Sequence, residues 1–234
     1  MTKISGFISE EEYEQGYTTL YHGTDARMVA MSVDERNEFF LNCRNAIDNL
    51  WELYKPLFQE LDSVDTAFDH YPRRLPKREI YKYKELLESK DRFLYYNLVE
   101  KLNMIDYWKQ GIQQYQYGDL YLTALEMKAE RYAMRSFAGG ELGLMVCRLV
   151  ESADIIGIDY SQSKEINAIE RVMQFALDEV NYDPVVFKLS NVPIRNLLTD
   201  EGKPLNEEIA NLCQDFRYVG DYNLSLESAR HLKE

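Results

Sequence analysis

The sequence is poor in the residues on which metal centres and disulfide frameworks depend. Among 234 residues there are 3 cysteines, 3 histidines and 2 tryptophans. The cysteines, Cys43, Cys147 and Cys213, form no CxxC pair and match no zinc-ligand spacing. We therefore expect buried thiols in a reducing compartment, and no metal site.

Long apolar runs and basic charge are also scarce. No run of about 18 apolar residues occurs, and the polar, acidic start of the chain is unlike a signal peptide. These absences predict a cytoplasmic protein with no membrane association. The chain has 40 acidic against 27 basic residues and a net charge of −13, which disfavours sequence-blind nucleic-acid binding over a broad surface. A local basic groove is compatible with that charge.

Apolar residues make up 45% of the chain and aromatic residues 13%, enough for a packed core. β-Branched and aromatic residues predict a first strand that ends at His22. Further apolar stretches predict strands at 120–123, 184–189 and 216–219. The stretch 142–150 fits either a strand or a buried helix.

Helical patterns fill most of the remaining sequence. Apolar residues three and four apart predict helices over 33–54, 91–112, 124–137 and 163–180, the last capped by Ser163, and a short helix over 225–232. Prolines at 72 and 76 predict a loop over 70–78. The expected fold is α+β, a single domain over 1–234 with a large helical insertion at about 33–114.

Three short segments carry residues suited to chemistry on a dinucleotide. They are Leu20-Tyr21-His22-Gly23-Thr24, Tyr121-Leu122-Thr123 with Tyr132 on the following helix, and Asp215-Phe216-Arg217-Tyr218-Val219. An enzyme that splits NAD must stack the nicotinamide on an aromatic ring and bind the ribose hydroxyls. A carboxylate must also stabilise the cationic ribose that forms as the glycosidic bond breaks.

In their order, these segments resemble the three motifs of the ADP-ribosyltransferase superfamily, of the diphtheria-toxin and poly(ADP-ribose) polymerase type. The resemblance implies a split β-sheet core and NAD as the substrate. It implies catalytic roles for His22, Tyr121 and Asp215. It also implies NAD contacts from His22 to a ribose hydroxyl, from the Gly23 backbone to the carboxamide, from Thr24 to the ribose, and from Tyr121 and Tyr132, which would sandwich the nicotinamide.

Two positions depart from the family pattern. The third motif has Asp215 where Glu is usual, and Gln214 beside it is a rival for the role; such variants resemble mono-transferases more than polymerases. On the helix, Ala129 stands where a serine often contacts the carboxamide, and Thr123 is a candidate substitute.

A basic segment interrupts the acidic chain at 73–84. Its cations Arg73, Arg74, Lys77 and Arg78 lie among tyrosines, which suits phosphates and unstacked bases; a solvated helix start is the simpler explanation of the same residues. We expect a mono-ADP-ribosyltransferase acting on RNA or DNA, a toxin of a toxin–antitoxin or phage-defence system with an antitoxin partner. The alternatives are a transferase acting on protein and a catalytically inactive binding module.

Overall fold

The computed structural model of the 234-residue chain describes residues 7–58, 61–64, 73–76, 84–109, 120–199, 202–210, 212–220 and 224–232. These residues fall into two compact units. The sheet unit comprises Met1–Ser32, Gln116–Gly140 and Asp178–Glu234, and the helical unit comprises Val33–Tyr115 and Glu141–Leu177. The mixed α+β class predicted from the sequence is confirmed.

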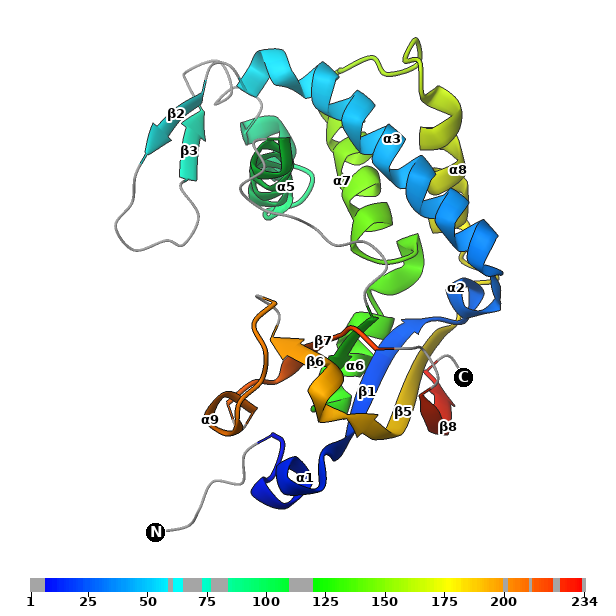
Figure 1. The fold of residues 1–234 in the computed structure, drawn as a ribbon. Helices are drawn as coiled ribbons and strands as arrows, with labels where there is room; N and C mark the ends of the chain where they lie inside the picture. The colour runs from blue at the N-terminus through cyan, green and yellow to red at the C-terminus, as the bar shows by residue number, and fades with distance from the viewer. Residues whose placement is uncertain are drawn as a thin grey trace. The chain divides into compact units, whose positions relative to one another are not determined.

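The sheet unit is built on one antiparallel six-stranded sheet in the order β6-β7-β4-β1-β5-β8 (Figure 1). The strands are β1 (Tyr17–Asp25), β4 (Leu120–Thr123), β5 (Pro184–Pro193), β6 (Leu197–Thr199), β7 (Asp215–Tyr218) and β8 (Ser225–His231). Strands β1, β4 and β7, which contain the three motif segments, are consecutive neighbours in this order. The segments are therefore adjacent in space although they are far apart in the sequence.

The two faces of this sheet bury different residues. On one face, Leu20, Leu122 and Phe216 come from the three neighbouring strands and join one apolar cluster. Each is almost fully buried, which contributes about 1.5–3 kcal/mol per side chain. On the other face, Ala129 and Ala133 of helix α6 (Glu126–Ala133) pack with Val186 and Tyr21. Small residues on α6 let the helix lie close to the strands.

Short helices complete the sheet unit: α1 (Glu10–Gln15), α2 (Ala26–Ala30) and α9 (Glu207–Ala210), with 3-10 turns at Ser136–Ala138 and Ile194–Asn196. Helix α1 begins with a capping box, in which Ser9 and Glu12 satisfy each other's backbone N–H groups. Glu12 also accepts a hydrogen bond from the Thr18 hydroxyl at 2.8 Å. This contact fixes α1 against the start of β1.

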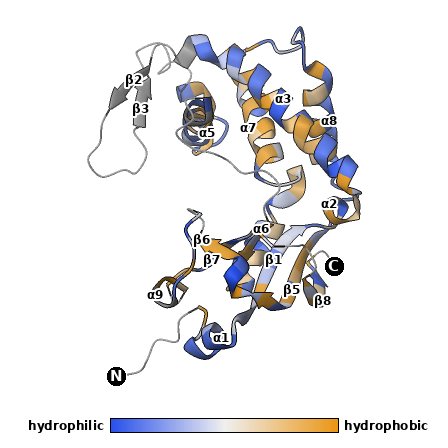
Figure 2. Cartoon of the chain, viewed as in Figure 1, coloured by the Kyte–Doolittle hydropathy of each residue, from blue (hydrophilic) through white to orange (hydrophobic). Residues whose placement is uncertain are grey.

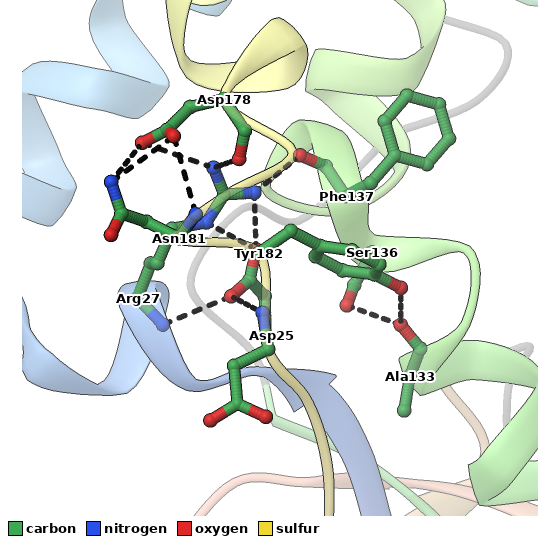
Figure 3. Close-up of polar contacts among 9 residues, drawn as sticks. Asp25, Arg27, Ala133, Ser136, Phe137, Asp178, Asn181 and Tyr182 are labelled. Atoms are coloured by element: carbon green, nitrogen blue, oxygen red, sulfur yellow. Dashed lines mark hydrogen bonds and ion pairs between the residues drawn. The ribbon is translucent and has the colours of Figure 1, made fainter. Parts of the chain in front are cut away.

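A buried ion pair anchors the end of β1 (Figure 3). The Asp25 carboxylate is fully buried and accepts two hydrogen bonds from the guanidinium of Arg27, at 2.8 and 2.6 Å. The same guanidinium donates to the carbonyl oxygens of Asp178 and Phe137 at 2.9 and 2.8 Å. It also lies 5.6 Å from the centre of the Tyr182 ring. Arg27 therefore ties the end of β1 to two other segments of the sheet unit.

The helical unit consists of helices α3 (Val33–Phe58), α5 (Leu94–Lys109), α7 (Glu141–Ile156) and α8 (Ile166–Leu177), and the hairpin β2 (Leu61–Val64)–β3 (Arg73–Pro76). Helix α7 contacts the other three helices and is largely apolar, as Figure 2 shows. Its Leu149 carbonyl accepts a hydrogen bond from the buried Tyr54 hydroxyl at 2.7 Å. Nowhere in the described ranges is a helix long and apolar enough to cross a membrane.

Four local predictions are wrong. The first strand does not end at His22 but continues to Asp25, because its pairing with β5 extends that far. Residues 225–231 form strand β8 rather than a helix, because backbone pairing with β5 outweighs the helix propensity of Leu226, Glu227 and Ala229. Within the predicted loop 70–78, Arg73–Pro76 pairs with β2 as a strand. The Ser163 hydroxyl has no hydrogen-bond partner in the described part of the chain, so it does not cap α8. The ambiguous stretch 142–150 is helical.

Candidate functional site

The first two strands of the site meet at a single backbone register pair, Tyr21–Thr123, within the described residues. Across β4, Thr123 in turn pairs with Asp215 at the start of β7. Neighbouring strands lie about 4.8 Å apart, so Tyr21 and Asp215 are separated by roughly 10 Å. The sheet thus brings the first, second and third motif segments together in one row.

His22 provides a second link between β1 and β4. Its Nδ1 atom lies 2.8 Å from the carbonyl oxygen of Tyr121. A carbonyl oxygen only accepts, so Nδ1 carries the hydrogen and donates it. In the neutral ring, Nε2 therefore has an available lone pair. Burial lowers the pKa of His22, against a smaller opposing effect of the Tyr121 hydrogen bond, so the ring is neutral at pH 7.

Gly23 allows helix α6 to approach β1. A Cβ atom built on Gly23 would lie 1.8 Å from the carbonyl oxygen of Ala129 and 2.8 Å from the backbone nitrogen of Ala133. Both contacts are shorter than the van der Waals limit and involve backbone atoms, which cannot move aside cheaply. Glycine at this position is therefore required for packing, whatever it binds.

Thr123 holds the second and third motifs together. Its hydroxyl donates to the carbonyl oxygen of Gln214 at 3.0 Å and accepts from the backbone N–H of Leu125 at 3.3 Å. The residue is 1% exposed, so its hydroxyl serves these local contacts. Gln214 itself is exposed and precedes β7, whereas Asp215 opens the strand and is half-buried. Of the two rivals for the acidic position, the geometry favours Asp215.

Asp215 forms an ion pair that the sequence analysis missed. One carboxylate oxygen, Oδ2, accepts a hydrogen bond from the ammonium of Lys128 on α6. The other oxygen, Oδ1, is buried and has no hydrogen-bond partner among the described residues. Lys128 also lies near the hydroxyl of Tyr132, one helical turn further along α6, and its charge opposes the rise of the Tyr132 pKa. A four-residue spacing on the predicted helix is the sequence signal that could have identified Lys128.

The two tyrosines predicted to contact nicotinamide are both accessible. Tyr121 is 39% exposed and Tyr132 is 45% exposed, although each is a large aromatic residue beside the buried core. Burial raises the pKa of the Tyr132 hydroxyl, and the nearby Asp215 carboxylate raises it further. Thr24, the last of the predicted NAD contacts, is half-buried on β1 opposite Val185.

The predicted nucleic-acid patch falls largely outside the described residues. Lys77 and Arg78 are not described, and Arg73 and Arg74 are described only as backbone in β3. The patch therefore stays a prediction. Over the described residues, no group of three or more histidine, cysteine or acidic side chains is arranged to hold a metal ion.

No protein-family model, curated protein or solved structure gives a significant match to this chain.

Proposed function

We propose that the chain is an NAD-dependent mono-ADP-ribosyltransferase whose site lies on β1, β4 and β7. The observation that carries the proposal is the row of neighbouring strands on which the three motif segments meet. A chance likeness of three short segments gives no reason for them to be adjacent in the fold. Among the described residues β1 and β4 share one register pair, which also suits a sheet that separates at this point, as a split sheet does.

The side chains have the chemistry that NAD cleavage needs. The neutral His22 ring offers Nε2 as an acceptor for a ribose hydroxyl, because Nδ1 is held by Tyr121. The exposed rings of Tyr121 and Tyr132 offer faces on which nicotinamide can stack. The Asp215 carboxylate supplies negative charge for the oxocarbenium-like transition state.

The proposed reaction exchanges one bond for another at the ribose anomeric carbon. The bond to the nicotinamide nitrogen breaks, and nicotinamide leaves with the bonding electron pair. The acceptor nucleophile forms the new bond and releases its proton to Asp215 or to solvent. We propose the transfer of a single ADP-ribose because family variants with aspartate or glutamine at this position resemble mono-transferases more than chain-building polymerases.

We propose a nucleic acid as the acceptor, because the basic segment 73–84 reverses the charge of an otherwise acidic chain. A cytoplasmic toxin of a toxin–antitoxin or phage-defence system is the setting that the family likeness suggests. A protein acceptor is the alternative within the same reaction. The ion pair of Asp215 with Lys128 favours a third reading, a binding module without activity, because it neutralises the carboxylate.

One incubation separates these readings. The purified chain is mixed with adenine-labelled NAD and cell lysate, and the labelled product is divided and treated with nuclease or protease. Label released only by nuclease supports a nucleic-acid acceptor, and label released only by protease supports a protein acceptor. If no label is transferred and no nicotinamide is released under any condition, the chain is a binding module without activity.

A further inference from the structure

Lys128 lies within the site but has no role in the reaction proposed above. It lies on α6, and its ammonium reaches β7 to pair with Asp215 while also contacting the Tyr132 hydroxyl. Its side chain is 30% exposed and that of Asp215 is 26% exposed, so the pair is shielded but can be reached from solvent. A carboxylate that is already neutralised by an ammonium is a poor stabiliser of positive charge.

Two further cations lie on, or just after, the elements that carry this site. Arg135 is close enough to Tyr132 to oppose the rise of its pKa. Arg217 stands two residues after Asp215 on β7, hence on the same face of the sheet, and pairs in register with Tyr121. The acidic residues Glu126 and Glu130 of α6 are paired with Arg230 instead. In a chain with a net charge of −13, this local excess of cations suits a phosphate.

The ion pair conflicts with the proposed chemistry unless it opens. An ammonium beside Asp215 cancels much of the field that would stabilise a cationic ribose. Lys128 can leave the carboxylate at low cost only if another anion replaces it. A nucleic-acid acceptor brings such an anion, its backbone phosphate, next to the site of attack, whereas water brings none.

We propose that Lys128 is a specificity-determining residue, which holds Asp215 in the absence of an acceptor and moves to a backbone phosphate when a nucleic-acid acceptor binds. This proposal rests on the function proposed above. The exchange breaks one ion pair and forms another, with no covalent change. Its consequence is slow cleavage of NAD by water and fast transfer of ADP-ribose to nucleic acid.

The test compares the full-length wild type with Lys128→Met, Lys128→Arg and the control Lys188→Met. Lys188 lies on β5, which carries no motif segment, and pairs with Glu227 at 2.6 Å, so its variant removes another ion-paired lysine of the sheet unit. For each protein, three quantities are measured: the Kd for NAD, nicotinamide release without acceptor, and label transfer to protein-free cellular nucleic acid. Thermal unfolding of each variant reports whether the fold is kept.

For Lys128→Met we expect label transfer to fall about tenfold, as the loss of one charge-assisted contact predicts. Nicotinamide release without acceptor should rise several-fold, because Asp215 loses its partner, and the Kd for NAD should stay within about twofold. Lys128→Arg keeps the charge and should keep most of the transfer. Lys188→Met should match the wild type in all three measurements.

Several results would overturn the proposal. A parallel fall of transfer and acceptor-free release in Lys128→Met would mean that Lys128 only positions Asp215. A weakened Kd for NAD would assign the ammonium to the diphosphate of NAD itself. If the wild type is active and Lys128→Met equals it in all three measurements, this proposal is refuted while the proposed function stands. A wild type that neither binds NAD nor releases nicotinamide would remove the proposed function, and this proposal with it.

Discussion

The ring of His22 on β1 donates its Nδ1 hydrogen to the backbone carbonyl of Tyr121 on β4, at 2.8 Å. This bond joins the first two motif segments and fixes the tautomer of the ring. It also makes the neutral state of His22 part of the folded structure, because a half-buried ring that gains a proton must carry a charge in a partly desolvated place. Stability is therefore expected to depend on pH through this residue.

The folded protein should lose stability as the pH falls below about 6.5. The pKa of His22 is lowered from 6.5 in the folded state, so the unfolded chain binds the proton first. The stabilisation is complete above the unfolded pKa and is lost as the pH falls through the folded one. Urea unfolding at pH 7.5, 6.5 and 5.5 measures this change in the free energy of unfolding. The difference between wild type and His22→Gln should shrink towards low pH; a constant difference would contradict the assignment.

Substitution of Gly23 by alanine should destabilise the sheet unit severely, because the added Cβ meets the Ala129 carbonyl oxygen at 1.8 Å. We expect a loss above about 3 kcal/mol, since backbone must shift to relieve the overlap. Gly157→Ala is the matched control. Gly157 has a φ of 78° and open space around its Cβ position, so only about 1–2 kcal/mol of backbone strain is expected. Equal unfolding midpoints for the two variants would refute the close approach of α6.

Removal of the Arg27 guanidinium should leave the Asp25 carboxylate buried without its main partner. The variant Arg27→Met is expected to lose about 3–5 kcal/mol of unfolding free energy, as a broken buried ion pair does. The control Arg171→Met removes an exposed pair with Glu38 and should cost no more than about 0.5 kcal/mol. Denaturant unfolding of both proteins would show comparable losses if Arg27 were not an anchor.

In the helical unit, Tyr54→Phe removes only the hydroxyl that donates to the Leu149 carbonyl at 2.7 Å. Because Tyr54 is fully buried and the Leu149 carbonyl keeps its hydrogen bond within α7, the loss of this one hydrogen bond should cost about 0.5–1.5 kcal/mol. Tyr96 is 57% exposed, so Tyr96→Phe should leave the thermal midpoint almost unchanged. If the two variants melt at the same temperature, this hydrogen bond does not stabilise the unit.

Elements with a strong local signal were predictable from the sequence. The strand containing His22 and the long helix α3 follow from residue pattern alone, although the strand extends to Asp25. Strand β8 was missed because its partner, β5, lies about 40 residues earlier in the sequence. A segment rich in helix formers became a strand only through that long-range pairing.

The residues of the site also differ in how far the sequence alone predicts them. His22, Gly23, Tyr121 and Asp215 could be selected from the sequence because each stands at a motif position. Lys128 stands at no motif position. Its four-residue spacing from Tyr132 is a weak signal, and its importance comes from a contact across 87 residues with Asp215. The packing role of Gly23 and the tethering role of Thr123 likewise depend on the approach of α6 and β7.

The central claim is that His22 and Asp215 act on NAD. It is tested most directly by nicotinamide release from NAD, with cell lysate present, for the wild type, Asp215→Asn, His22→Ala and the control His231→Ala. His231 pairs with Asp183 on the sheet and is 57% exposed, so it matches His22 in residue type but not in location. We predict a fall of about 100-fold or more for Asp215→Asn and a clear fall for His22→Ala, with His231→Ala unchanged. Equal release from all four proteins, or from none, would contradict the account.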